Sequence, residues 1–240
     1  MSVTDAVATG VPFSTLADTV LERLTATYAP AADPERAAPM RAYMKDVAPF
    51  LGLTTPVRRA LSRTVVAGLP RPDENDCTAI ALRCWQLPER EYHYFAVDYL
   101  RRHARVCSSG FLPVARHLIA TTSWWDTVDL LAAHVVGALV AADPALKADM
   151  DTWIVDDDLW IARTALLHQL RYKEHTDTER LFTYCLRQSG HPDFFVRKAI
   201  GWCLREYAKT DPEAVRAFLA RERGRFAPLS VREALKNIGA

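Results

Sequence analysis

The sequence predicts an all-α fold in which antiparallel helix pairs repeat and stack as a solenoid. Signals for β-structure are nearly absent, because no Asn-Gly or Asp-Gly hairpin turn and no sustained alternation of apolar and polar residues occurs. Apolar residues instead recur at helical spacing. Predicted helix starts return at intervals of 32, 35, 35 and 37 residues, at Glu91, Ser123, Asp158, Asp193 and Ser230. The last four of these residues are expected to be polar N-caps of their helices. An interval of this length is typical of helical solenoids.

The chain before Glu91 is less periodic but still helical in pattern. Helices are expected over 15–28, 34–47, 56–67 and 73–85, separated by prolines that interrupt helical structure. Further along, apolar positions keep helical spacing over 118–139 and again over 161–170. One domain over residues 1–240 is expected.

A short Arg-x-Ala-apolar step returns every 34 or 35 residues, at 163–166, 197–200 and 232–235. The alanine is expected where helices approach closely, and the arginine is expected on a comparable edge each time. Equivalent positions of stacked repeats line one concave surface. Basic and aromatic residues in a row on such a surface would suit the backbone of a nucleic-acid duplex.

Composition restricts the classes of function. The chain is 50% hydrophobic and 25% charged, which is typical of an ordered protein, and its net charge of +1 argues against a tail that is basic throughout. The charges are nevertheless segregated. Residues 143–158 include six acidic residues and one basic residue. Residues 160–209 include nine basic residues and five acidic residues. A basic face on an otherwise neutral protein is therefore expected.

Five cysteines without a CxxC pair predict neither a disulfide framework nor a zinc or iron–sulfur site, and small buried side chains are expected instead. No cofactor or metal is expected, since His134, His168 and His191 lack a metal-site spacing. Residues 1–13 do not resemble a signal peptide, and the longest apolar run, 128–142, is too short to span a bilayer. A cytoplasmic monomer without a membrane anchor is expected.

The segment most unusual in chemistry is Ser-Trp-Trp-Asp-Thr-Val-Asp at 123–129, with two tryptophans and two carboxylates in the first turns of a helix. Trp125 and Asp129 are four residues apart and share a helix face. Of the two adjacent tryptophans, one is expected in the core and the other toward the groove. Stacked repeats would bring Arg163 and Trp202 to the same neighbourhood. A carboxylate, an arginine and two aromatic walls suit a sugar that becomes cationic beside a phosphate.

Several stretches together resemble the AlkD branch of the HEAT-like-repeat DNA alkylation repair glycosylases. The resemblance runs from about residue 15 to the C-terminus. It rests on Met-Arg-Ala-Tyr-Met-Lys at 40–45, Arg-Glu-Tyr-His-Tyr at 90–94, the segment 123–129, Leu-Trp-Ile-Ala-Arg-Thr-Ala at 159–165 and Arg-Lys-Ala-Ile-Gly-Trp at 197–202. The resemblance implies a HEAT-like-repeat solenoid with a concave, basic DNA-binding surface.

Residue roles follow from the same resemblance. It implies that Asp129 is the catalytic carboxylate, that Trp125 and Trp202 contact the deoxyribose, and that Arg163 lies near the backbone of the lesion. Basic residues expected to bind DNA are Lys45, Lys173, Arg197, Lys198 and Arg205. The implied partner is double-stranded DNA that carries alkylated purines.

The resemblance also implies a mechanism, in which the damaged base stays stacked instead of being extruded into a pocket. An N3- or N7-alkylated purine is already a cationic leaving group, so no general acid is required. The enzyme then stabilises an oxocarbenium-like sugar and positions water. Lesion size stays open between small methyl adducts and bulky natural-product adducts, because some similar proteins confer self-resistance on producers of compounds such as yatakemycin.

Two rival classes of function are considered. A catalytically silent repeat scaffold that binds DNA or protein is one, because solenoids often serve as scaffolds; the combination of Asp129 with two tryptophans argues against it. Another kind of hydrolase is the second, but the sequence contains no Gly-x-Ser-x-Gly elbow, His-Glu-x-x-His motif or phosphate-binding loop.

Overall fold

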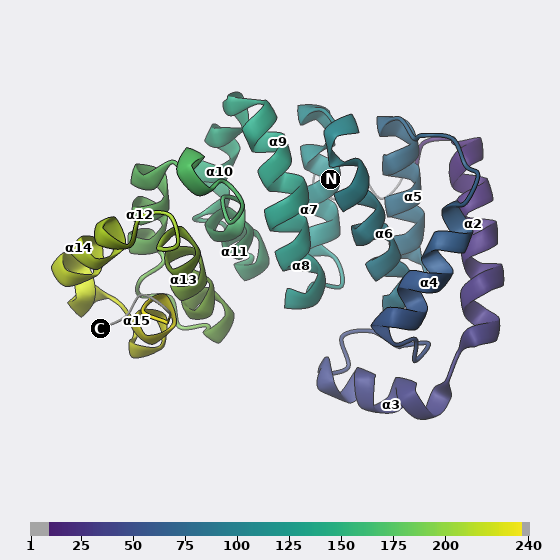
Figure 1. The fold of residues 1–240 in the computed structure, drawn as a ribbon, viewed down its shortest axis with the longest axis horizontal. Helices are drawn as coiled ribbons and strands as arrows, with labels where there is room; N and C mark the ends of the chain where they lie inside the picture. The colour runs from purple at the N-terminus through teal and green to yellow at the C-terminus, as the bar shows by residue number, and fades with distance from the viewer. Residues whose placement is uncertain (1–9, 237–240) are drawn as a thin grey trace. The chain divides into compact units, whose positions relative to one another are not determined.

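The computed structural model describes residues 10–236, and the regular elements in this range are helices without a single strand (Figure 1). This finding confirms the predicted all-helical repeat fold. The chain forms two compact units, divided between Thr127 and Val128 inside helix α8 (Trp125–Leu131). A single domain over residues 1–240 stays a prediction, as does the concave basic surface.

The first unit consists of helices that pack side by side, with α2 against α4 and α5, and α5 against α6. Helix α3 lies across the ends of α2 and α4 (Figure 1) and contributes no buried residue. The helices that precede α8 are α2 (Thr15–Tyr28), α3 (Pro34–Tyr43), α4 (Thr55–Val66), α5 (Glu74–Gln86), α6 (Arg90–His103) and α7 (Leu112–Ala120).

Helix bounds in the first unit agree closely with those expected. Helix α2 covers 15–28 as predicted, and Asp73 caps α5 through a reciprocal capping box with Asp76. The helix expected to reach residue 47 ends at Tyr43. The reason is local, because Lys45 and Asp46 adopt left-handed backbone angles, with φ of 57° and 58°, that cannot continue an α-helix.

The second unit continues from α8 into a π-helical turn, η4 (Ala132–Val136). In this unit, α13 packs most extensively against α15 and next most extensively against α11. The remaining helices are α9 (Gly137–Ala142), α10 (Lys147–Trp153), α11 (Leu159–Leu167), α12 (Thr178–Arg187), α13 (Phe194–Tyr207), α14 (Pro212–Glu222) and α15 (Pro228–Ala234).

Two of the four predicted polar caps are confirmed. Asp158 accepts a hydrogen bond from the Trp160 amide at 2.8 Å, and Asp193 accepts one from the Phe195 amide at 2.6 Å. The prediction was wrong for Ser123, whose hydroxyl donates backward to the Ile119 carbonyl at 2.6 Å. It was also wrong for Ser230, which lies inside α15 and donates to the Arg197 carbonyl at 2.8 Å.

Small residues allow the close approach of helices in the second unit. The alanines of the Arg-x-Ala step, Ala165, Ala199 and Ala234, are fully buried as predicted. Gly201 packs so tightly that an added Cβ would lie 2.4 Å from the Cβ of Glu233. The arginines of the step, in contrast, do not share one environment: Arg163 is buried, Arg197 is half-buried and Arg232 is exposed. The three arginines therefore differ in burial, and their position on a common edge stays a prediction.

The five cysteines are free and buried, which confirms the expectation of small buried side chains. The apolar run at 128–142 belongs to a longer continuous helix. The stretch Trp125–Ala142 has 18 residues and is apolar and long enough to cross a membrane by composition, but 67% of it is buried inside the protein. Burial of this kind is typical of a core helix, whose apolar face packs against neighbouring helices.

We expect Gly201→Ala to lower the free energy of unfolding by about 1–3 kcal/mol, because the added methyl group would overlap both Glu233 and the Ser230 carbonyl at 2.7 Å. Chemical denaturation measures the change. Gly224→Ala is the matched control, since a Cβ added at Gly224 would meet no atom within 4 Å. Equal stability of the two variants would contradict the tight packing of α13 on α15.

Stability should also fall in acid because of His168. Burial lowers the pKa of His168 to about 4, and its Nδ1 bonds to the Ala165 carbonyl at 2.7 Å. The unfolded chain takes up this proton near pH 6.5 whereas the folded chain resists it, so stability declines as the pH falls from 6.5 toward 4, by up to about 1.4 kcal/mol per pH unit. Unfolding measured across this range should show a shallower decline for His168→Gln. His175→Gln, at an exposed position, should keep the slope of the unchanged protein; an unaltered slope in His168→Gln would count against the argument.

Candidate active site

The centre of the candidate site is an ion pair in the second unit, between Asp129 of α8 and Arg163 of α11. The Arg163 Nε donates to one carboxylate oxygen at 2.7 Å and its Nη2 donates to the other at 2.8 Å. Both side chains are nearly buried, with 11% of Asp129 and 4% of Arg163 exposed. Two parallel bonds of this kind fix the plane and direction of the carboxylate.

Helix α13 completes the surroundings of Arg163. The third guanidinium nitrogen, Nη1, donates to the backbone carbonyl of Phe195, and the guanidinium carbon lies 6.0 Å from the centre of the Phe195 ring. The ring of Trp160 lies 5.1 Å from that of Phe195. Arg163 therefore links α8, α11 and α13, and all three of its bonds are made inside the protein.

This arrangement determines the charge that Asp129 can present. A buried carboxylate is expensive to ionise alone, and a guanidinium beside it favours the ionised form. A guanidinium is a permanent cation, so Arg163 acts as a counter-charge to the carboxylate and not as a proton donor to a reactant. The pair thus supplies an oriented, partly compensated negative charge, which is suited to stabilising a cation.

Trp202 lies on α13 seven residues after Phe195, so two helical turns separate them on one face. The side chain of Trp202 is half-buried. Lys198 and Arg205 are four residues before and three residues after Trp202, which places an aromatic ring between two basic side chains on one stripe of α13. The Lys198 ammonium lies 5.6 Å from the centre of the exposed Phe194 ring, and Arg205 pairs with Glu233 at 3.1 Å.

Trp125 belongs to the first unit, where it begins α8 and is half-buried. Trp124 is also half-buried, so exposure does not divide the tryptophan pair into one core and one groove residue as expected. Asp126, the other carboxylate of the segment, has a different environment from Asp129. Its oxygens accept Arg90 Nε at 3.0 Å, Arg90 Nη2 at 2.5 Å, the Tyr94 hydroxyl at 2.5 Å and the Thr127 amide at 3.0 Å.

Four accepted bonds fill the ordinary capacity of a carboxylate, so Asp126 serves the packing of α8 on α6. Burial and the adjacent Asp126 carboxylate raise the pKa of Tyr94, which keeps the phenol protonated and donating. Asp126 therefore anchors the start of the helix that also carries Asp129, the acid that the resemblance marks as catalytic.

The other basic residues expected to bind DNA lie in varied places. Arg197 donates to the His191 carbonyl at 2.8 Å. Lys173 is exposed at the edge of a pocket of about 290 Å³ that Tyr207 and Lys209 also line, next to the Cys203 face of α13. Lys45 is exposed in the first unit, in the turn after α3. The structure thus gathers Lys198, Trp202 and Arg205 on one stripe, whereas Lys173 and Lys45 lie elsewhere.

Sequence reasoning missed Phe194 and Phe195, of which Phe195 bonds to Arg163 through its carbonyl. A signal was present, because the pair follows the cap Asp193 in the same way that two tryptophans follow Ser123: adjacent aromatic residues in the first turn of a repeat helix. It also missed the cluster that buried Arg90 and half-buried Tyr94 form around Asp126. That cluster lies in the Arg-Glu-Tyr-His-Tyr stretch, where spacing alone does not indicate which residues point inward.

Comparisons with known proteins identify the family of this chain. The sequence profile described as "DNA alkylation repair enzyme" matches residues 24–238. A solved structure described as a "Predicted DNA alkylation repair enzyme from Enterococcus faecalis" is similar to this chain with a TM-score of 0.78 and 30% sequence identity, covering 86% of this chain and 96% of that one. Among curated proteins, none matches. Because the profile covers nearly the whole chain, this protein belongs to the DNA alkylation repair enzyme family.

Proposed function

We propose that this protein is a monofunctional DNA glycosylase of the AlkD branch, which hydrolyses the N-glycosidic bond of cationic N3- or N7-alkylated purines in duplex DNA. The observation that supports the proposal most directly is the buried Asp129 carboxylate, held by the two-pronged bond from Arg163. Asp129 lies at the motif position that the resemblance to this branch marks as catalytic. Membership in the DNA alkylation repair enzyme family agrees with a substrate in DNA.

In this proposal Asp129 stabilises positive charge on the deoxyribose as the bond to the base breaks, and positions the attacking water. Trp202 and Trp125 contact the sugar and attract the developing cation through their ring faces. Arg163 acts as a positioning residue that keeps the carboxylate ionised and correctly oriented. A preorganised charge is effective because it does not have to reorient during the reaction.

Arg163 also limits the effect of Asp129. At an effective dielectric constant of about 20, a carboxylate roughly 4 Å from the sugar cation contributes ~4 kcal/mol of attraction, and a guanidinium roughly 8 Å away contributes ~2 kcal/mol of repulsion. The remainder of about 2 kcal/mol corresponds to roughly a thirtyfold acceleration. Each tryptophan face adds ~1–2 kcal/mol when water is excluded. These contributions suffice for a substrate whose leaving group is already activated.

The leaving group supplies that activation in the proposed reaction. An N3- or N7-alkylated purine carries positive charge and departs as a neutral base, so it needs no proton from the enzyme. The base stays stacked in the duplex while the protein acts on the sugar, unlike in enzymes that extrude the base. A base that is not enclosed allows both methyl adducts and bulky adducts of the yatakemycin type, and hence either general repair or self-resistance. The protein is proposed to act on DNA as a cytoplasmic monomer.

We expect Asp129→Asn to reduce excision of N7-methylguanine at least tenfold while leaving affinity for duplex DNA within a few-fold of that of the unchanged protein, because the substitution removes charge but keeps shape. Single-turnover excision measures the first quantity and equilibrium binding the second. Loss of the carboxylate leaves Arg163 buried without its counter-charge, so some loss of stability is also expected.

Asp126→Asn is the matched control, because it removes a buried, arginine-paired carboxylate three residues earlier in the same helix. At a temperature where both variants are folded, the Asp126 variant should excise at a rate close to that of the unchanged protein, and the Asp129 variant should show the loss of at least tenfold. Undiminished excision by Asp129→Asn would contradict the catalytic role. Duplex binding without excision by the unchanged protein would favour a DNA-binding scaffold.

Substrate choice should follow the charge of the damaged base. Duplexes that carry N7-methylguanine, a bulky cationic N3-adenine adduct or uracil are incubated with the protein, and abasic sites are then cleaved chemically. We expect strand breaks at the cationic purines and none at uracil, since no proton is supplied to a neutral base. Efficient release of uracil would show that the protein activates the leaving group itself. Release of the bulky adduct alone would assign the protein to self-resistance.

A further inference from the structure

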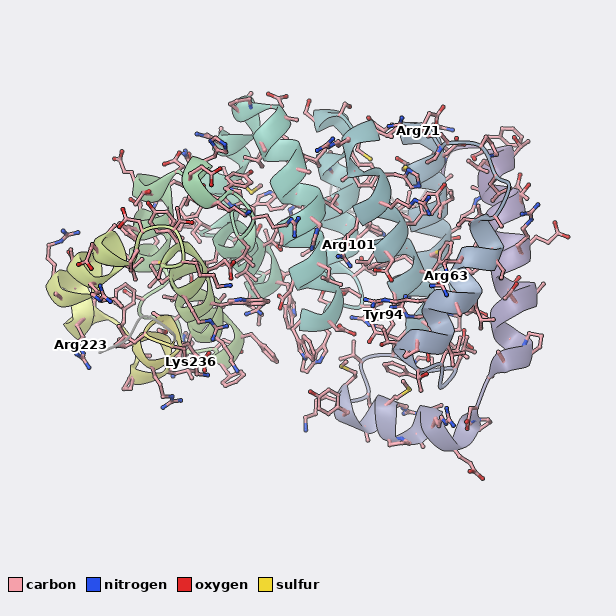
Figure 2. All side chains as sticks on the ribbon, viewed as in Figure 1. Arg63, Arg71, Tyr94, Arg101, Arg223 and Lys236 are labelled. Carbon is pink, nitrogen blue, oxygen red and sulfur yellow. The ribbon has the colours of Figure 1, made fainter. Side chains whose placement is uncertain are left out.

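Helix α6 in the first unit carries a charged stripe that the proposed chemistry does not use. Tyr94, Asp98 and Arg101 are spaced four and three residues apart and therefore share one face of α6. Figure 2 labels Tyr94 and Arg101, both on α6. Arg58 reaches the stripe from α4 and lies over the Tyr94 ring, with its guanidinium carbon 5.1 Å from the ring centre.

Two arginines share one carboxylate in this stripe. Arg58 Nη1 donates to one oxygen of Asp98 at 2.8 Å, and Arg101 Nη1 donates to the other at 3.1 Å. The Arg58 side chain is only 8% exposed, so its charge requires a partner. One carboxylate balances one guanidinium, and the group of Arg58, Asp98 and Arg101 keeps one excess positive charge.

The neighbouring acids do not compensate this excess. Asp126 is occupied by Arg90 and by the Tyr94 hydroxyl. Glu91, fully buried, accepts the backbone amides of the loop before α4, from Leu51 at 2.9 Å, Gly52 at 2.9 Å and Leu53 at 3.0 Å. The local potential of this part of α6 is therefore positive.

Arg101 also has an unsatisfied donor. Its Nε is buried and makes no hydrogen bond, whereas 31% of its side chain remains exposed. A buried donor without an acceptor costs ~1–3 kcal/mol. An oxygen-rich anion that drew the guanidinium outward would accept from Nε and a terminal nitrogen together, and would neutralise the excess charge at the same time.

We propose that Arg101 and Arg58, bridged by Asp98, form a binding site for a phosphodiester group of the DNA backbone. A phosphodiester fits because it is a monoanion with two unsubstituted oxygens, which matches one excess charge and the planar fork of arginine. The inference rests on the proposed function for the choice of DNA over other anions. It assigns a phosphate contact to the first unit, at residues outside the Asp129 site.

The test compares Arg101→Gln with Arg102→Gln, which remove the same charge from adjacent positions that point about 100° apart around α6. Binding of an undamaged duplex is measured from low to physiological salt. We expect Arg101→Gln to lower the slope of log affinity against log salt by about 1, and to weaken binding several-fold at low salt. Arg102→Gln should retain the slope of the unchanged protein. Equal slopes for all three proteins would overturn the site.

Asp98→Asn gives a second readout that a purely structural role would not produce. Removing the shared carboxylate raises the local positive charge by one, so duplex affinity should increase several-fold at low salt even where stability falls. A decrease in affinity of the folded variant would contradict the proposal. Polyglutamate is the competing probe, and equally tight binding with the same dependence on Arg101 would assign the site to an acidic protein surface instead of DNA.

The test of the phosphate site can fail or succeed independently of the test of glycosylase activity. Undamaged duplex requires no excision, so a loss of slope in Arg101→Gln together with an inactive unchanged protein would overturn only the proposed function. Normal excision with an unchanged slope in Arg101→Gln would overturn only the phosphate site.

Discussion

Buried guanidinium groups in this protein are held by carboxylates that come from a neighbouring helix, and the positions of the inner helices depend on these ion pairs. In the first unit Arg58 of α4 bonds to Asp98 of α6, and Arg90 of α6 bonds to Asp126 of α8. In the second unit Arg163 of α11 bonds to Asp129 of α8. Removing one member of such a pair leaves a buried charge uncompensated, at a cost of about 3–5 kcal/mol.

Helix α8 is unusual among these helices because it supplies two of the carboxylates. Asp126 and Asp129 are less than one turn apart, yet one bonds to α6 within the first unit and the other to α11 within the second. The partners of these two acids lie 36 and 34 residues away along the chain, close to the repeat length. The proposed catalytic carboxylate and the carboxylate that packs α8 on α6 are thus both held by an arginine from another helix.

Much of the architecture could be predicted from the sequence, because helical periodicity and prolines depend on local interactions. Helix α2, the caps at Asp158 and Asp193, and the buried alanines at 165, 199 and 234 were all predicted correctly. The burial and the hydrogen-bond partners of individual arginines could not be predicted. Arg163, Arg197 and Arg232 occupy the same motif position, but burial depends on an acceptor in another helix, which periodicity does not reveal.

The candidate site was only partly predictable for the same reason. The sequence indicated Asp129 and Arg163 as members of one site. It did not indicate that the three guanidinium nitrogens of Arg163 would donate to Asp129 and to the Phe195 carbonyl. Ser123 shows that local sequence does not decide between two hydrogen-bonding roles. A serine before a helix can donate to the carbonyl of the preceding turn as readily as it can cap the helix that follows.

The direct bond from Arg163 to Asp129 has a consequence for specificity. The Asp129 carboxylate is bonded by a guanidinium, a group without a readily donated proton, so in the proposed enzyme this pair would stabilise a cation without supplying an acid. An unmodified purine leaves DNA as an anion unless it is protonated, and it would gain only the stabilisation of the sugar. An alkylated purine leaves as a neutral molecule and needs nothing more. In the proposed enzyme, discrimination between damaged and intact DNA therefore arises from the chemistry of the lesion, and the protein need not enclose the base to recognise it.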